Sequence, residues 1–147
     1  MLSHVYVGIN NFEAALGFYS AVMEVIGARQ RFVDPIRPWA AWQPAEGARP
    51  LFIIGAPYDG QPASCGNGQM ISLLATSREM VDRAYAAARA HGGACEGAPG
   101  LRPQYHANYY GAYFRDPDGN KFSVVCHDAL PDQASASLAA SSGVRPS

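Results

Sequence analysis

The sequence repeats itself at an offset of 66 residues (70 − 4), the feature that most constrains its fold. Aligning His4 with Met70 also aligns Asn10 with Thr76, Glu13 with Glu79, Tyr19 with Tyr85, and Gly27 with Gly93. In each half an N-cap residue type is followed three residues later by Glu, which marks a helix start, and an apolar run precedes it. Because each matched pair has a structural role, the repeat indicates a duplicated unit in which a strand leads into a helix.

Periodicity and turn residues predict the same elements twice. In the first half we expect a strand at 4–9, a helix at 11–26, and strands near 29–33, 39–43 and 51–55. The apolar face of that helix is predicted to consist of Phe12, Ala15, Leu16, Tyr19, Met23 and Ile26. In the second half we expect a strand at 69–75, a helix at 77–91, and strands near 94–97, 108–115 and 121–126.

This order predicts a single α+β domain over residues 1–127. Module one takes 1–57, a linker takes 58–68, and module two takes 69–127. The Ala- and Ser-rich remainder, 128–147, is predicted to be a flexible tail.

Composition narrows the function classes. With 11 basic and 12 acidic residues the net charge is −1, and we expect neither a nucleic acid nor a membrane as partner. No basic stretch precedes an apolar one at the N-terminus, so no signal peptide is expected. Cys65, Cys95 and Cys126 form neither a disulfide framework nor a CxxC site. A reducing cytoplasm is the expected compartment.

A turn near the C-terminus carries a family resemblance. Asp116-Pro-Asp-Gly-Asn120 joins two apolar strands as a hairpin, and the strand His4-Val-Tyr-Val-Gly-Ile-Asn10 leads into the first helix. Together these motifs resemble the vicinal oxygen chelate superfamily, which includes glyoxalase I, extradiol dioxygenases, and fosfomycin-resistance and bleomycin-binding proteins. The resemblance covers about residues 2–127. It implies two βαβββ modules whose sheets form a cup-shaped, partly open mixed sheet.

The same resemblance implies where a metal would bind. In metal-dependent members the first and last strands of each module supply one ligand each, and a Glu stands at the position of Ser123. The other matching positions are His4, Met70, and Phe52 or a neighbour in 51–54. Only His4 is a good ligand for the divalent ions these enzymes use. We therefore expect no metal and no other cofactor at the cup floor. A divalent metal is the alternative, and one such alternative site would join His4, His106 and His127.

The segment 99–110 predicts a ligand wall, because it gathers hydrogen-bonding and aromatic side chains between stiffening prolines. Its alternative roles are a surface loop or a dimer contact. In module one, Arg37, Trp39 and Trp42 form a weaker set. The candidate pocket residues are His4, Trp39, Met70, Arg102, Tyr105, His106, Tyr109 and Ser123. No catalytic residue is assigned, since neither Ser123 nor Cys126 lies in a nucleophile motif.

These patterns give three hypotheses of function. The first is a homodimeric glyoxalase/bleomycin-resistance-like protein with a degenerate metal site that binds a small molecule in the cup. The second is an enzyme with an altered metal site, such as a divergent lyase or isomerase resembling lactoylglutathione lyase, or a dioxygenase. The third is an interaction protein whose cup is filled by Phe52, Met70 and Trp39. Bound metal would discriminate the first two.

Overall fold

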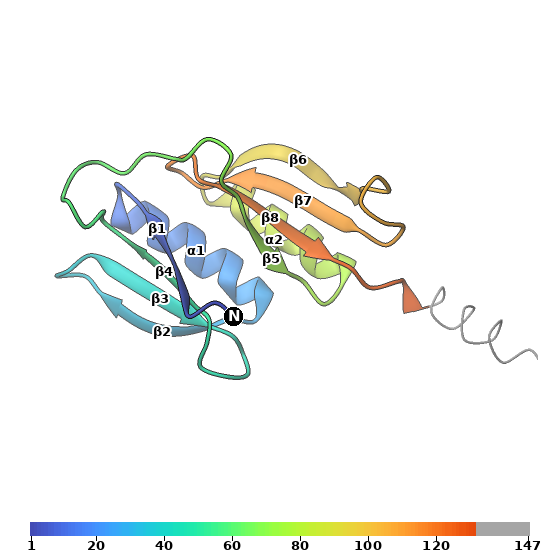
Figure 1. The fold of residues 1–147 in the computed structure, drawn as a ribbon, viewed down its shortest axis with the longest axis horizontal. Helices are drawn as coiled ribbons and strands as arrows, with labels where there is room; N and C mark the ends of the chain where they lie inside the picture. Colours follow the sequence, from blue (N-terminus) through green and yellow to red (C-terminus); the bar gives the residue numbers. More distant parts are fainter. Residues whose placement is uncertain (132–147) are drawn as a thin grey trace, which may run out of the picture.

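Two four-stranded sheets and two helices form an α+β fold in the computed structural model, which describes residues 1–131 (Figure 1). Module one contains β1 (His4–Gly8), α1 (Phe12–Ile26), β2 (Arg29–Asp34), β3 (Trp39–Gln43) and β4 (Leu51–Gly55). Module two contains β5 (Ile71–Leu74), α2 (Arg78–Ala90), β6 (Ala94–Leu101), β7 (Tyr110–Arg115) and β8 (Lys121–Cys126). The predicted α+β fold of two βαβββ modules is confirmed. Most of the predicted tail lies outside the described residues.

The two sheets have the same topology. Their strand orders are β1-β4-β3-β2 and β5-β8-β7-β6, so the first and last strands of each module are neighbours. Those two pairs are parallel, and the other pairs are antiparallel. The repeat in the sequence is therefore a repeat of structure.

Both helices begin one residue later than predicted. The N-caps are Asn11 and Ser77, whose side chains accept hydrogen bonds from the amides of Ala14 and Met80. The predicted cap at Asn10 is wrong, because the Asn10 side chain bonds to Ala63 instead. The two observed caps keep the offset of the repeat (77 − 11 = 66).

Strand β6 is longer than the predicted segment at 94–97, and β7 begins at Tyr110 rather than 108. Pro99 lies inside β6, where its missing N–H costs little because β6 is an edge strand. The pairing of β6 with β7 is also irregular between Cys95 and Gly100.

Helix α1 packs against both sheets, as Figure 1 shows by its position between them. The Tyr19 ring lies 5.3 Å from Phe52 of module one and 5.6 Å from Phe122 of module two, between ring centroids. The Phe18 ring packs edge-on against Phe114 at 6.0 Å. Phe18 and Val22 are thus buried in addition to the predicted apolar face. Each such burial contributes about 1.5–3 kcal/mol.

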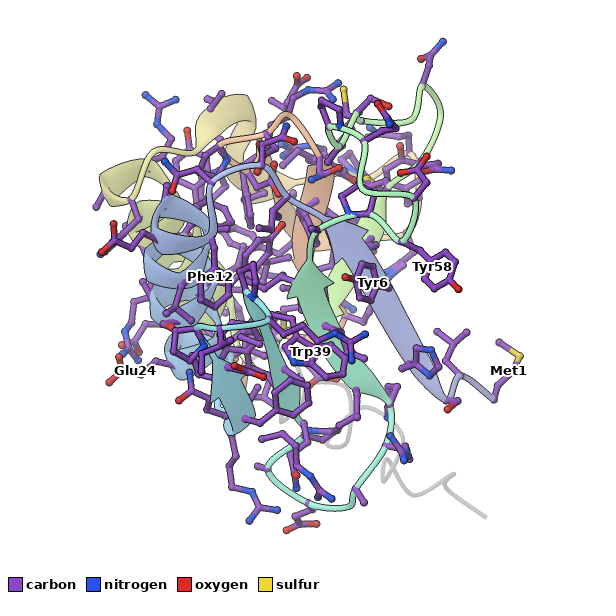
Figure 2. All side chains as sticks on the ribbon, turned by 90° about the vertical axis from the view of Figure 1, so that its left-hand side faces the viewer. Met1, Tyr6, Phe12, Glu24, Trp39 and Tyr58 are labelled. Carbon is purple, nitrogen blue, oxygen red and sulfur yellow. The ribbon has the colours of Figure 1, made fainter. Side chains whose placement is uncertain are left out.

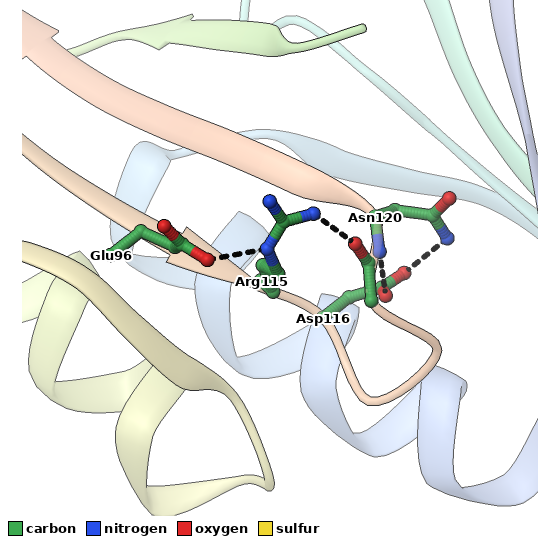
Figure 3. Close-up of polar contacts among 5 residues, drawn as sticks. Glu96, Arg115, Asp116 and Asn120 are labelled. Atoms are coloured by element: carbon green, nitrogen blue, oxygen red, sulfur yellow. Dashed lines mark hydrogen bonds and ion pairs between the residues drawn. The ribbon is translucent and has the colours of Figure 1, made fainter. Parts of the chain in front are cut away.

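The turn between β7 and β8 joins the modules through the carboxylate of Asp116. This buried group accepts hydrogen bonds from the amides of Asp118 and Asn120, the Asn120 side chain, and the Tyr19 hydroxyl at 2.5 Å. Figure 3 shows its bonds to Asn120, beside the ion pair of Arg115 with Glu96. Asn120 also donates to the carbonyl of Gly8, so the turn is fixed to both β1 and α1.

Replacing Tyr19 with Phe tests this junction. Loss of a hydrogen bond to a buried carboxylate is expected to cost about 1.5–3 kcal/mol of unfolding free energy near neutral pH. Burial and the neighbouring Asp116 raise the pKa of Tyr19 well above its usual value. Above about pH 10 the unfolded wild-type chain therefore loses the Tyr19 hydroxyl proton, whereas the folded state keeps it. The free energy of unfolding consequently falls as pH rises above about 10.

Urea denaturation of wild type and Tyr19→Phe at pH 8 and above pH 10 measures both effects. The alkaline loss should be smaller in Tyr19→Phe, by up to about 1.4 kcal/mol per pH unit. Tyr58→Phe is the control, since Tyr58 is fully exposed and should change neither quantity. Equal alkaline slopes for wild type and Tyr19→Phe would contradict the assignment.

Candidate functional site

Residues along each strand alternate between the core and an outer surface, which we call the open face. In module one, Val7, Trp42, Phe52 and Ile54 belong to the core cluster. The residues that alternate with them on β1, β3 and β4 therefore lie on the open face. They include His4, Tyr6, Gly8, Trp39, Ile53 and Gly55.

A cavity of about 940 Å³ lies over this open face. Its floor comes from β1 and the start of β3. Residues 56–64, which join the end of module one to the linker, form a wall that we call the linker wall. The lining side chains that carry charge or an aromatic ring are His4, Tyr6, Arg37, Trp39, Tyr58 and Asp59. Figure 2 shows Tyr6, Trp39 and Tyr58 on the side of the sheet away from α1. We call this space the module-one cavity.

Gly55 allows Tyr6 to cross the floor. A Cβ at Gly55 would collide with the Tyr6 hydroxyl and lie 3.1 Å from the Cβ of Trp39. The Tyr6 hydroxyl donates to the carbonyl of Ala56 at 2.6 Å, which fixes the ring across β4. Two aromatic side chains thereby lie on either side of one glycine.

Trp39 is held between two neighbours. The Phe32 ring lies 4.7 Å from it between centroids, and the guanidinium carbon of Arg37 lies 4.1 Å from its centroid, a cation–π contact. Arg37 belongs to the β2–β3 turn, where the Asp34 carboxylate accepts from the amides of Ile36 and Arg37. Trp42, by contrast, is buried in the core.

Asn10 fixes the linker wall. Its side-chain amide donates to the carbonyl of Ala63 at 3.0 Å, and its oxygen accepts from the amide of Ala63 at 2.7 Å. The wall also approaches β1 closely, since a Cβ at Gly8 would lie 3.1 Å from the Cβ of Ala63. The position of the wall therefore depends on one side chain that precedes α1.

The register of the sheets fixes the four positions that the resemblance assigns to metal ligands. Tyr6 pairs with Ile53 in module one just as Ser72 pairs with Ser123 in module two. The last-strand position of module one is thus Ile53. Ile53 is one of the positions in 51–54 that the resemblance left open. Phe52 itself faces the core, so the alternative in which Phe52 fills the cup is wrong.

The four side chains at these positions are an imidazole, a thioether, a hydroxyl and an alkyl group. Ser123 is fully buried and donates to the Ser72 hydroxyl at 2.7 Å. Within residues 1–131 no three His, Cys, Asp or Glu side chains come together to hold a metal ion. This donor set does not fit the divalent ions of the superfamily, which need about three nitrogen, sulfur or carboxylate ligands.

The predicted wall residues of module two form a separate group, which we call the module-two cluster. Tyr109 and Tyr113 share a hydrogen bond of 2.9 Å, and the Tyr105 ring lies 4.8 Å from that of Tyr109. The Arg102 guanidinium donates to the carbonyl of Ala98 and lies over Tyr113. Burial, with the hydrogen bond from Tyr109, raises the pKa of Tyr113 to about 12.

Two of the three histidines of the alternative metal site, His106 and His127, are in contact. Nε2 of His106 lies 2.8 Å from Nδ1 of His127, and their rings stack beside Tyr109. His4 lines the module-one cavity and bonds to Ser3, so within the described residues it does not complete a three-histidine site.

The predicted pocket residues therefore fall into distinct places. His4 and Trp39 line the module-one cavity. Arg102, Tyr105, His106 and Tyr109 belong to the module-two cluster, and Ser123 lies beneath the open face of its sheet. Met70 borders a smaller hollow of about 140 Å³ between β1 and the ends of β5 and β8. Sequence reasoning missed Tyr6 and Tyr58, although Tyr6 shares the alternation of His4.

Comparison with known proteins identifies the family to which this fold belongs. The sequence profile of the Glyoxalase/Bleomycin resistance protein/Dioxygenase superfamily matches residues 1–124. The chain belongs to this superfamily. No curated protein matches it.

Several solved structures share the fold. A glyoxalase/bleomycin resistance protein from Albidiferax ferrireducens T118 is 37% identical, with a TM-score of 0.76 over 86% of this chain and 98% of that one. A glyoxalase-related enzyme from Fulvimarina pelagi is 17% identical (TM-score 0.66, 86% and 87% covered). The antibiotic-binding protein TnmS3 from Streptomyces sp. CB03234 is 22% identical (TM-score 0.58, 87% and 96% covered). The last two similarities concern the fold alone.

Within residues 1–131, no helix is long and apolar enough to cross a membrane.

Asn10→Ala tests the linker wall. Losing two hydrogen bonds is expected to lower the unfolding free energy by about 1–3 kcal/mol and to speed hydrogen exchange at the Ala63 amide. The matched control is Asn11→Ala, which removes the N-cap of α1 at a cost of about 1 kcal/mol but leaves the Ala63 amide protected. Backbone hydrogen exchange by NMR separates the two. Unchanged exchange at Ala63 in Asn10→Ala would show that the wall is held by other contacts.

Proposed function

We propose that this protein binds a small molecule in the module-one cavity and does so without a metal at the cup floor. The cavity itself carries the proposal. It combines two fixed aromatic side chains, Tyr6 and Trp39, with a cation, Arg37, and its volume lies within the range of ligand sites in proteins. The linker wall beside the cavity is held by the two hydrogen bonds between the Asn10 side chain and Ala63.

The side chains at the four metal-ligand positions of the cup favour small-molecule binding over metal-dependent catalysis. Ile53 and Met70 stand where ligands would be needed, and the hydroxyl of Ser123 is already bonded to Ser72. A metal-dependent lyase, isomerase or dioxygenase activity would need a different set of ligands. That enzyme remains the alternative, and bound metal is the observation that would favour it.

A homodimer in the cytoplasm completes the proposal. Strands β1 and β5 are sheet edges. The apolar side chains of Tyr6 on β1 and Leu74 on β5 are exposed, and so are those of Leu2 and Met70 just before these strands. Exposed apolar side chains along an unpaired edge favour association with a second chain. Cys65, Cys95 and Cys126 are free, as in a reducing compartment. Light scattering of the purified protein tests the dimer, and a single-chain mass would remove this part of the proposal.

Tryptophan substitution tests the binding site. A thermal-shift screen of small molecules should give hits whose affinity falls by about 1–2 kcal/mol in Trp39→Ala, because an aromatic contact is lost. Tyr109→Ala and His106→Ala test whether the module-two cluster also contacts the ligand. If it does, each variant should lower the affinity by about 1–2 kcal/mol. Trp42→Phe is the control, since Trp42 is a core residue. It should lower the melting temperature while leaving the affinity unchanged. Hits that are insensitive to Trp39 would place the site elsewhere.

Measuring the metal content tests whether the four metal-ligand positions of the cup bind a divalent ion. Protein purified without chelator is expected to hold well below one Zn, Ni, Mn or Fe per chain. Ser123→Glu alone should not create a tight site, because it raises the number of suitable ligands only to two. Adding Met70→His raises the number of suitable side chains to three, the number of protein ligands in open zinc sites, but His4 and Met70 line different hollows of the described chain, so a tight site would require them to approach each other. Calorimetry with Ni²⁺ or Zn²⁺ measures both variants. About one metal per chain, lost in His4→Ala, would overturn the metal-free floor.

A further inference from the structure

Arg37 is a charged lining residue whose hydrogen-bonding capacity the fold does not use. Its guanidinium contacts the Trp39 ring, and among residues 1–131 its N–H groups have no hydrogen-bond or ion-pair partner. Three other arginines have such partners, since Arg31 bonds to Gln43, Arg102 to Ala98, and Arg115 to Glu96. The remaining arginines of the described chain share Arg37's lack of one, but none of them lines the module-one cavity. Stacking uses the face of a guanidinium and leaves its N–H edge available for a planar anion.

The nearby carboxylates accept hydrogen bonds within their own turns and keep their negative charge. Asp34 accepts the amides of residues 36 and 37, and Asp59 accepts the amide of Gln61. Neither forms an ion pair with Arg37 in the described part of the chain. The other titratable lining groups are His4, which bonds to Ser3, and the hydroxyls of Tyr6 and Tyr58. Arg37 is therefore the one permanently charged cation on the cavity lining.

The rest of the lining favours a flat apolar body. Tyr6 lies across Gly55 and is fixed by its bond to Ala56, while Trp39 is fixed between Phe32 and Arg37. Fixed aromatic rings bind planar rings with little loss of conformational entropy. The cavity volume of about 940 Å³ is large enough for a ligand of two or three fused rings.

Resting on the proposed function, we propose that the ligand of the module-one cavity is a planar aromatic acid. Its ring system stacks on Tyr6 and packs against the part of Trp39 that lines the cavity, and its carboxylate or other planar anionic group accepts from the N–H edge of Arg37. Arg37 is then the residue that determines specificity for an acidic ligand, and Trp39 both supports the ring and orients Arg37.

A matched pair of probes tests the class of ligand. Calorimetry should show that 2-naphthoate binds about tenfold more tightly than 2-naphthamide, which has the same shape without the charge; tenfold corresponds to about 1.4 kcal/mol. The preference should shrink as salt is raised. Arg37→Gln should remove this preference by weakening the acid at least tenfold more than the amide, and Arg37→Lys should retain part of it. Trp39→Ala should weaken both probes.

The control is Arg31→Gln, which removes a neighbouring surface cation of the same sheet that is absent from the cavity lining. It should leave the preference intact, and melting curves should show all four variants folded. Equal affinity of wild type for acid and amide, with both weakened by Trp39→Ala, would overturn the acid class while the cavity remains a binding site. The same holds if neither probe binds but the screen yields neutral or cationic ligands sensitive to Trp39→Ala. If no compound binds at all, the proposed function falls with the inference.

Discussion

The buried carboxylate of Asp116 is the interaction on which the arrangement of the two modules depends. A buried charge is costly unless it is fully hydrogen-bonded, and four donors satisfy this one. Three come from its own turn and the fourth is the Tyr19 hydroxyl of the other module. The turn can therefore reach its lowest energy only when α1 is docked against β8. Because Asn120 of the same turn also holds Gly8, this contact positions the end of β1, beside which Ala63 of the linker wall lies.

The two modules share a backbone but have diverged on their open faces. By sheet register, Gly55 of module one corresponds to Val125 of module two, and Ile53 corresponds to Ser123. Glycine lets Tyr6 lie across the strand and leaves space above it. In module two, Val125 is buried, and a Cβ at Gly111 would touch both it and the Tyr109 ring. One open face is thus hollow while the other is covered by its own loop.

The sequence predicted the fold well because the repeat, the turn at 116–120 and the apolar periodicity all report local structure. It failed where two neighbours have equal propensity. Asn10 and Asn11 are both good N-caps, and only the long-range bond to Ala63 decides between them. Within the run 51–54 every residue is apolar, so alternation cannot show that Ile53, not Phe52, faces outward. The cavity could not be predicted, because its wall comes from a linker with no periodicity.

The proposed ligand class follows from how charge is distributed in such a cup. A divalent metal at the floor would supply positive charge at the base of the pocket and draw oxygen ligands toward it. Where the floor carries Ile53, Met70 and Ser123, no such charge is available, and an anionic group would have to find a cation on the wall. Arg37 supplies that cation at the turn before β3, and its contact with Trp39 fixes its position on the cavity lining. In this binding mode the acid group of the ligand points to the rim of the module-one cavity, away from the floor.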